Sequence, residues 1–87
     1  MSPEAAEALL RTIPEYAWLT QSGRQIYTTA EVAEYLHIGV FAVRVRCQDG
    51  LFPGAIDYGI GIGWRIPRSG LILYLANRVQ QGQIDAG

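Results

Sequence analysis

The chain has 87 residues, of which 49% are hydrophobic, and a formal net charge of −1. This length allows one small domain with a modest core and excludes large catalytic machinery such as that of an integrase. No apolar run approaches the roughly 18 to 20 residues of a membrane helix, and no basic segment typical of a signal peptide opens the chain. We therefore expect a cytoplasmic protein with no membrane partner, whose single cysteine, Cys47, lies in the core.

Arginines are concentrated in the central part of the chain. Residues 24–78 hold six Arg against four acidic residues, a net charge of +2, whereas residues 1–23 hold one Arg against three Glu, a net charge of −2. All basic residues are Arg and none is Lys. The guanidinium fork suits phosphates and guanine edges, so the central part favours nucleic-acid binding although the total charge argues mildly against it. A high-GC genome would produce the same preference for Arg.

The first predicted element is a helix over residues 2–13. Pro3 suits the first helical position after a Ser cap, and Pro14 ends the segment. Leu9 and Leu10 lie on its apolar stripe. A helix this short needs a surface to dock on, which is either the rest of this chain or a second copy, so both leucines are candidates for self-association.

Residues 16–27 are predicted to form a small hairpin or an extended arm, with a turn at residues 21–23. Its aromatic side chains either close over the core or take part in a strand exchange with a second copy. Together with the first helix, this segment makes up an N-terminal helix and arm, residues 1–25, that precedes the main domain at residues 26–80.

The segment over residues 28–48 has the pattern of a helix-turn-helix. Thr28 and Glu31 carry the signature of a capping box at the start of the first helix. Gly39 supplies the corner, and a second helix follows over residues 40–48. Two short helices joined by about three residues that include Gly are typical of this motif.

The second of these helices has one apolar side and one mixed side. At about 100° per residue, the inward stripe is Val40, Val43 and Cys47. The outward side carries Phe41, Arg44, Val45 and Gln48, with Arg46 on the flank. Arg binds guanine O6 and N7, and Gln binds adenine N6 and N7, so the outward side predicts contacts in the major groove of DNA. Taken alone, the same pattern also fits a solvated amphipathic helix.

A hairpin that acts as a wing is predicted next, with strands at residues 55–58 and 64–66. The alternating glycines between them lack the spacing of a nucleotide-binding loop. The tip residues Ile60, Gly61 and Ile62 carry no charge, so they either wedge into a minor groove or contact a neighbouring subunit.

The last helix is predicted to start at residues 67–69 and to end at Gly82. Leu73 and Tyr74 fall outside its core stripe and leave its outer side apolar. They join the candidates for self-association, as a dimer or as a head-to-tail filament. Residues 81–87 are predicted to form a flexible tail. The predicted fold class is therefore α+β, a small winged helix-turn-helix with an N-terminal helix and arm.

Three segments in order resemble the phage excisionase (Xis) family: residues 27–36, residues 49–53, and residues 64–71 followed by Tyr74-Leu75. Members are MerR-like winged helix-turn-helix proteins, also called recombination directionality factors. The resemblance covers residues 26–78. It implies a small, non-catalytic protein that binds repeated double-stranded DNA sites beside a phage attachment site, bends the DNA cooperatively and directs a phage integrase toward excision in the bacterial host cell.

The resemblance also assigns roles to residues. It implies that Arg44, Val45 and Gln48 face the groove, that Arg65 is the DNA contact of the wing, and that Thr29 contacts a phosphate. Arg68 either contacts DNA or only begins the last helix. The chain departs from the family at Gly39–Ala42, where small polar and basic residues are usual, at Gly70, where an acid is common, and at the uncharged wing tip.

Two other functions fit the same sequence. Relatives of this fold include transcription activators, so a winged-helix transcriptional regulator is the nearest alternative. The near-neutral charge and the uncharged wing tip also fit a protein-interaction module that has lost DNA binding. An enzyme is not expected, because His37 is the only histidine and no second His or Cys completes a metal set. We expect no catalytic residue, metal or cofactor.

Overall fold

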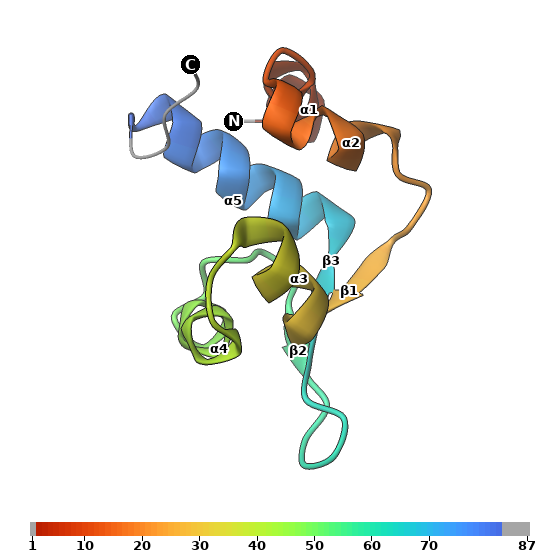
Figure 1. The fold of residues 1–87 in the computed structure, drawn as a ribbon, viewed down its shortest axis with the longest axis vertical. Helices are drawn as coiled ribbons and strands as arrows, with labels where there is room; N and C mark the ends of the chain where they lie inside the picture. The colour runs from red at the N-terminus through yellow and green to blue at the C-terminus, as the bar shows by residue number, and fades with distance from the viewer. Residues whose placement is uncertain (1, 83–87) are drawn as a thin grey trace.

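The computed structural model describes residues 2–82. Its elements are α1 (Pro3–Arg11), α2 (Pro14–Gln21), β1 (Ile26–Thr28), α3 (Thr29–Leu36), α4 (Val40–Gln48), β2 (Ile56–Asp57), β3 (Trp64–Pro67) and α5 (Arg68–Gln80). Helices α3 and α4 form the helix-turn-helix, and the β2–β3 hairpin is the wing (Figure 1). The predicted fold class, a winged helix-turn-helix of the α+β type, is confirmed.

The three strands form one antiparallel sheet in the order β1-β3-β2. Tyr27 of β1 lies opposite Ile66 of β3, and Ile56 of β2 lies opposite Arg65 on the other side of β3. Strand β1 runs directly into α3 and pairs with the wing strand β3, so the sheet holds the wing at a fixed position relative to the helix-turn-helix. The tip of the wing extends beyond the sheet (Figure 1).

The prediction of a hairpin or arm over residues 16–27 is wrong for its first half, residues 16–21. That part of the chain forms helix α2, which starts at Pro14. Trp18 donates a hydrogen bond from Nε1 to the carbonyl of Glu15 (2.7 Å), and Leu19 is fully buried. Proline suits the first position of a helix, and the burial of Leu19 in the core outweighs the preference of the aromatic residues for strands. The second half leaves the helix at Ser22, which has an extended backbone, and ends in β1.

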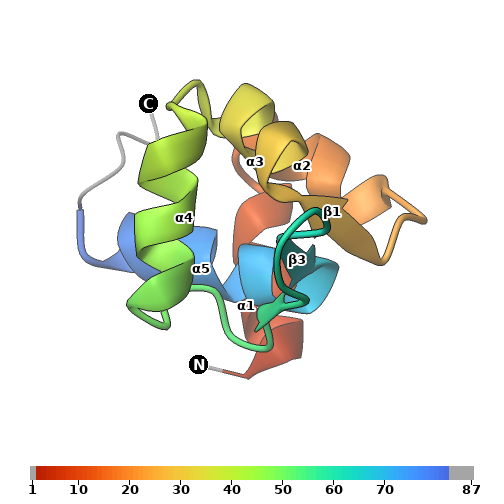
Figure 2. The same cartoon turned by 90° about the horizontal axis from the view of Figure 1, so that it is seen from below.

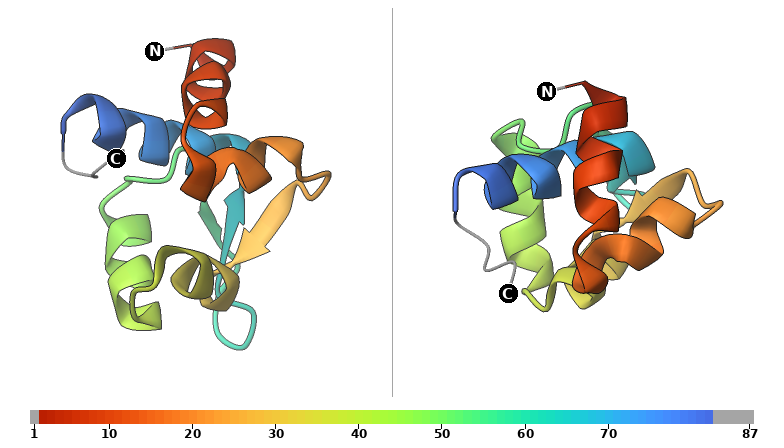
Figure 3. Two further views of the ribbon diagram at one scale, coloured as in Figure 1. Left: turned by 45° about the horizontal axis from the view of Figure 1, so that its top comes forward. Right: turned by 90° about the horizontal axis from the view of Figure 1, so that it is seen from above.

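A single core lies between α5 and the elements that surround it. Its largest fully buried side chains come from all five helices, the sheet and the loop after α4: Leu10, Leu19, Tyr27, Val32, Val43, Phe52, Ile66, Leu71 and Leu75. Helix α1 packs on α5 and on α2, and Figure 3 shows α1 crossing α5 with α2 beside it. The first helix therefore docks on its own chain, one of the two alternatives that the sequence left open.

Helix α5 has the predicted limits, from Arg68 to the glycine that follows its end, Gly82, at a φ of 72°. Near its start it approaches the loop after α4 very closely. A Cβ built on Gly70 would lie 2.0 Å from the carbonyl oxygen of Pro53, so this packing requires a glycine. The departure from the excisionase pattern at this position therefore follows from the packing. Residues 83–87 of the predicted tail lie outside the described residues.

The elements form two opposite surfaces. Viewed from below, the wing tip and α4 lie toward the viewer (Figure 2), whereas α1 and α2 stand at the other end of the molecule (Figure 3). We call the first surface, formed by the start of α3, the outward side of α4 and the wing, the wing face. We call the second, formed by α1, α2 and α5, the support face.

Candidate nucleic-acid interface

Helix α3 starts at a hydrogen-bonded cap. Thr28 Oγ1 accepts a hydrogen bond from the amide of Glu31 (3.1 Å), and a Glu31 carboxylate oxygen accepts one from the amide of Thr28 (2.9 Å), which confirms the predicted capping box. The bond from the Thr28 amide is the main cause that lowers the pKa of Glu31, and the charge of Arg24 acts in the same direction. Thr29 is thereby fixed as the first helical residue, where the helix dipole favours an anion.

The corner between α3 and α4 differs from the prediction at one residue. His37 adopts the left-handed conformation, with a φ of 57°, and ends α3. Gly39 has a φ of −75° and is the N-cap of α4. Histidine enters the left-handed region more often than most side chains do, so His37 makes the turn that the sequence assigned to Gly39.

Helix α4 presents its mixed side to solvent, as predicted. Val43 and Cys47 are buried, whereas Val40, which was predicted to point inward, lies in the first turn and is 37% exposed. Burial raises the pKa of the Cys47 thiol to about 11. The outward residues Phe41, Arg44, Val45 and Gln48 are all exposed. The Arg44 guanidinium has no hydrogen-bond or ion-pair partner within residues 2–82, so its donors are free for a ligand.

The wing tip depends on glycines and one aspartate. Gly59, Gly61 and Gly63 have φ values of 95°, 88° and 77°, a region that other residues rarely enter. Asp57 accepts a hydrogen bond from the amide of Gly59 (2.9 Å), which closes the turn in the manner of an Asx turn. Ile60 at the tip is fully exposed. The tip therefore holds a large apolar side chain in solvent on a defined backbone.

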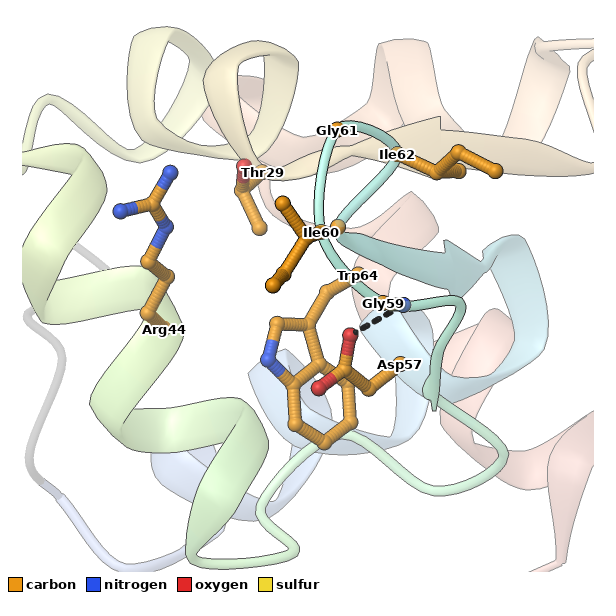
Figure 4. A pocket seen from close by; sticks show the side chains of 9 residues that line it. Thr29, Arg44, Asp57, Gly59, Ile60, Gly61, Ile62 and Trp64 are labelled. Atoms are coloured by element: carbon orange, nitrogen blue, oxygen red, sulfur yellow. Dashed lines mark hydrogen bonds between the residues drawn. The ribbon is translucent and has the colours of Figure 1, made fainter.

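A hollow of about 480 Å³ lies between α4, the start of α3 and the wing (Figure 4). Its lining consists of Thr29, Arg44, Asp57, Gly59, Ile60, Gly61, Ile62, Gly63 and Trp64. Arg44 stands on the α4 side, Ile60 on the wing side, and Thr29 between them. The fold thus brings together three predicted contacts, Thr29, Arg44 and the wing tip, on one concave surface. Its donors suit a phosphate or a guanine edge.

The predicted site residues omit four residues of this lining: Gly59 and Gly63, which flank the predicted tip, and Asp57 and Trp64. Asp57 and Trp64 each had a signal in the sequence. An Asp two residues before a Gly is typical of an Asx turn, and Trp64 shares a strand face with the buried Ile66 by the two-residue period of a strand. The carboxylate of Asp57 lines the same hollow as Arg44, and it is an acceptor of the kind that binds cytosine N4.

The other predicted residues on this face lie beside the hollow. Arg65 follows Trp64 on β3 and therefore points to the opposite side of the sheet. Its Nη1 donates to the carbonyls of Ile62 (2.8 Å) and Trp64 (3.1 Å), which braces the base of the tip and leaves other N–H donors available. Val45 and Gln48 are exposed on α4 but take no part in the lining.

The structure places two of the predicted DNA contacts, Arg46 and Arg68, away from the wing face. Arg46 donates from Nε to the hydroxyl of Tyr74 (3.0 Å) and from Nη1 to the carbonyl of Ala42 (3.0 Å). Arg68 reaches the end of α2, where Nε donates to the carbonyl of Leu19 (3.1 Å) and Nη2 to that of Thr20 (2.8 Å), and it forms an ion pair with Glu7. The geometry gives both guanidinium groups a role within the fold.

Two of the four candidates for self-association, Leu10 and Tyr74, lie in the core and not on an outer surface, so the prediction is wrong for these two. Leu10 is fully buried and Tyr74 is 7% exposed, with its ring 4.6 Å from that of Phe52. Leu9 and Leu73 are partly buried and pack against the core. The cause is that α1 and the loop after α4 cover sides of α5 that helical periodicity alone leaves exposed.

Large exposed apolar side chains are instead frequent on the wing face. On α4 and the wing they are Val40, Phe41, Val45, Ile56, Tyr58, Ile60 and Ile62, of which Phe41 is 77% exposed. Exposed apolar groups in such number on a small domain mark an interaction surface.

None of the helices within residues 2–82 has the length and apolar character that crossing a bilayer requires. The same residues contain no group of three or more His, Cys, Asp or Glu placed to hold a metal ion.

A free outward side of α4, next to a wing and the capped start of α3, defines a winged helix-turn-helix DNA-binding protein. Comparison with protein families agrees, because the sequence model of the family described as a helix-turn-helix domain matches residues 26–79. This is more than half of the chain, and the chain belongs to that family. The matched stretch begins at β1 and ends in the last turn of α5. Comparisons with curated proteins and with solved structures return no significant match.

Proposed function

We propose that this DNA-binding protein is an excisionase, which binds repeated sites beside a phage attachment site, bends the DNA and directs a phage integrase toward excision. The observation that supports it most is the hollow that joins Arg44 of α4 to the wing tip, in a chain that resembles the excisionase family over residues 26–78. The protein acts in the cytoplasm of the bacterial host and is not an enzyme.

In this proposal three elements engage the duplex together: α4, the start of α3 and the wing. Helix α4 enters the major groove, with Arg44 at a guanine and Gln48, one helical turn further, at an adenine. Thr29 offers its hydroxyl and backbone to a phosphate at the positive end of α3, and Arg65 contacts the backbone beside the wing. Because the β1–β3 pairing fixes the angle between α3 and the wing, a duplex that contacts both must follow the concave surface, which favours a bend.

Cooperative loading on repeated sites requires contacts between neighbouring copies. The exposed Ile60, Ile62 and Phe41 provide apolar surface for that purpose, since burying apolar area between subunits stabilises an assembly. The assembly is a dimer or a head-to-tail filament, which spreads along the DNA when the contact does not close on itself.

A gel-shift titration tests this function with an attachment-site DNA, a random DNA and two salt concentrations. An excisionase gives a ladder of specific shifts that weaken with salt, because bound phosphates release counterions. Replacing Arg44 and Arg65 together by Ala should abolish site binding and leave thermal unfolding unchanged. Arg11→Ala, at an exposed residue of α1, is the matched control. Unchanged binding by the double variant would overturn the proposed interface.

Two alternatives give different results in the same assay. A winged-helix transcriptional regulator gives a single specific shift without a ladder, and no integrase gene adjoins its own. The acidic Asp57 inside the hollow favours the second alternative, an interaction module that has lost DNA binding. That protein shows no specific shift and almost no salt dependence in any residual association.

A further inference from the structure

A second hollow, of about 140 Å³, lies on the side of α4 that faces α2 and α5. Its lining combines two arginines, two tyrosines and three aliphatic residues: Tyr16, Leu36, Ile38, Arg46, Tyr74, Leu75 and Arg78. It shares no residue with the hollow on the wing face. Any ligand held here would leave the outward side of α4 and the wing tip free.

The charged residues of this lining are both cations. Arg46 donates from Nε to the Tyr74 hydroxyl (3.0 Å), and the guanidinium of Arg78 lies 5.4 Å from the centre of the Tyr74 ring. Two guanidinium groups thus surround one tyrosine, and no carboxylate joins them in the lining. Two cations that line one hollow repel each other, and an anion bound between them would replace that repulsion with charge-assisted hydrogen bonds.

The two tyrosines add hydrogen-bond donors to the lining of the hollow. The Tyr74 oxygen accepts from Arg46, so its own proton remains available for a ligand. Burial raises the pKa of Tyr16, and the charge of Glu15 acts in the same direction, so the Tyr16 hydroxyl keeps its proton at neutral pH. Guanidinium and hydroxyl donors of this kind suit an anion with several oxygens.

The remaining wall is apolar. Leu36 and Ile38 come from the end of α3 and the turn after it, and the buried Leu75 comes from α5. A bare inorganic anion would leave these apolar side chains without a partner. A carboxylate on a short aliphatic stem would contact both the guanidinium and hydroxyl donors and the apolar wall. The side chain of a glutamate or an aspartate has this form.

We propose that the second hollow is a binding site for a carboxylate side chain, presented by an acidic segment of a protein partner while α4 and the wing remain on DNA. A hollow of this size admits one short side chain and excludes a duplex. The same chemistry is present in Asp85 of this chain, three residues beyond Gly82, and the test below separates the two sources.

The test is an NMR titration of the full ¹⁵N-labelled chain that follows the Nε–Hε signals of Arg46 and Arg78. The probes are acetyl-Leu-Glu-Leu-amide and its uncharged counterpart acetyl-Leu-Gln-Leu-amide. The Glu peptide should shift both signals in a saturable manner, and the Gln peptide should not. Inorganic phosphate should bind more weakly than the Glu peptide. Equal responses to the two peptides, or a stronger response to phosphate, would overturn the proposal.

Variants separate a binding role from a folding role. Arg78→Gln removes one guanidinium whose recorded contact is the face of Tyr74, and it should weaken the Glu peptide at least fivefold with thermal unfolding unchanged. Arg11→Gln, at an exposed arginine of α1, should bind as the parent does. If Arg78→Gln also binds the peptide normally, the site does not exist as described.

Two further measurements identify the source of the carboxylate and isolate this site from DNA binding. If Asp85→Asn alone moves the Arg46 and Arg78 signals and improves peptide binding, the chain's own carboxylate occupies the site and the partner assignment is overturned. No such change supports a partner. The gel shift should be the same with Arg78→Gln as with the parent. If the Glu peptide does not bind but the gel shift with DNA is normal, the carboxylate site is refuted and the proposed DNA-binding function is unaffected.

Discussion

The wing face and the support face both contain arginine, but they use it in opposite ways. On the support face, Arg68 donates to two carbonyls of α2 and pairs with Glu7. On the wing face, the Arg44 guanidinium is left without a partner within residues 2–82 and lines an open hollow. The difference shows that the number of arginines in a segment does not indicate how well that segment can bind DNA. What matters is whether the protein's own acceptors already satisfy the guanidinium donors.

The same comparison revises the charge argument. The net charge of +2 over residues 24–78 includes Arg68 and Arg24, which form ion pairs with Glu7 and Glu31 respectively. Glu31 is already counted in that sum, so only Glu7, which lies outside residues 24–78, balances a further charge, one of the two in excess. The charge that remains on the wing face comes mainly from Arg44, with Arg65 beside it.

The largest expected effect comes from removing the arginine of the support face. Arg68→Ala leaves two carbonyls of α2 and the carboxylate of Glu7 without their main donor. We expect it to lower the free energy of unfolding by about 3 kcal/mol, measured by urea denaturation. DNA affinity per folded molecule should not change.

The matched change on the wing face is Arg44→Ala. It should leave the free energy of unfolding within about 0.5 kcal/mol of the parent and weaken specific DNA binding by about 1–3 kcal/mol. If both arginine variants lose stability equally, the distinction between the faces does not hold.

A smaller effect is expected at the contact between α5 and the loop after α4. Gly70→Ala places a Cβ against the carbonyl oxygen of Pro53, and the required backbone shift should cost about 2 kcal/mol of stability. Gly23→Ala is the control, because nothing lies within 4 Å of a Cβ at that position. Thermal unfolding of the two variants should differ clearly, and similar melting temperatures would mean that the loop moves freely.

The next effect is expected at the capping box that starts α3. Glu31→Gln removes a charged acceptor from the amide of Thr28 and from Arg24, and it should cost about 1 kcal/mol at neutral pH. The folded pKa of Glu31 is lowered from the usual 4.5. Its contribution is therefore complete above that value and is lost as the pH falls through the folded pKa. Parent and variant stabilities should converge below pH 4.5, and a constant difference would contradict this account.

The smallest effect on stability is expected at the wing tip. Ile60→Ser changes a fully exposed side chain, so the free energy of unfolding should stay within about 0.5 kcal/mol of the parent. The gel-shift ladder should weaken if the tip joins neighbouring copies. Ile66→Val, at a fully buried isoleucine, should instead lose about 1 kcal/mol. A large stability loss in Ile60→Ser would place the tip in the core.

The elements that the sequence predicts well depend on local contacts. The capping box of α3 joins residues three apart, and the wing tip follows from its alternating glycines. The limits of α5 follow from Arg68 after a proline and from Gly82. Such signals lie within a few positions of the residues that they govern, so a single sequence contains them.

The features that the sequence does not predict depend on partners far along the chain. Arg46 meets Tyr74 across 28 positions, and Arg68 meets Glu7 across 61. Helical periodicity places each residue on a side of its own helix but does not say which other element covers that side. The sequence therefore predicts a surface position for Tyr74 and offers Arg68 as a DNA contact. It also predicts an arm where the burial of Leu19 in the core stabilises helix α2.

The buried Cys47 makes the protein convenient for labelling. It is the only cysteine of the chain, and its raised pKa of about 11 keeps the thiol protonated and slow to react with maleimides near neutral pH. A cysteine introduced at the wing tip, as in Ile60→Cys, would therefore be the one thiol that a fluorophore or spin label modifies. Distances from that label to a labelled duplex would report directly on how the wing approaches DNA, without first removing a native residue from the core.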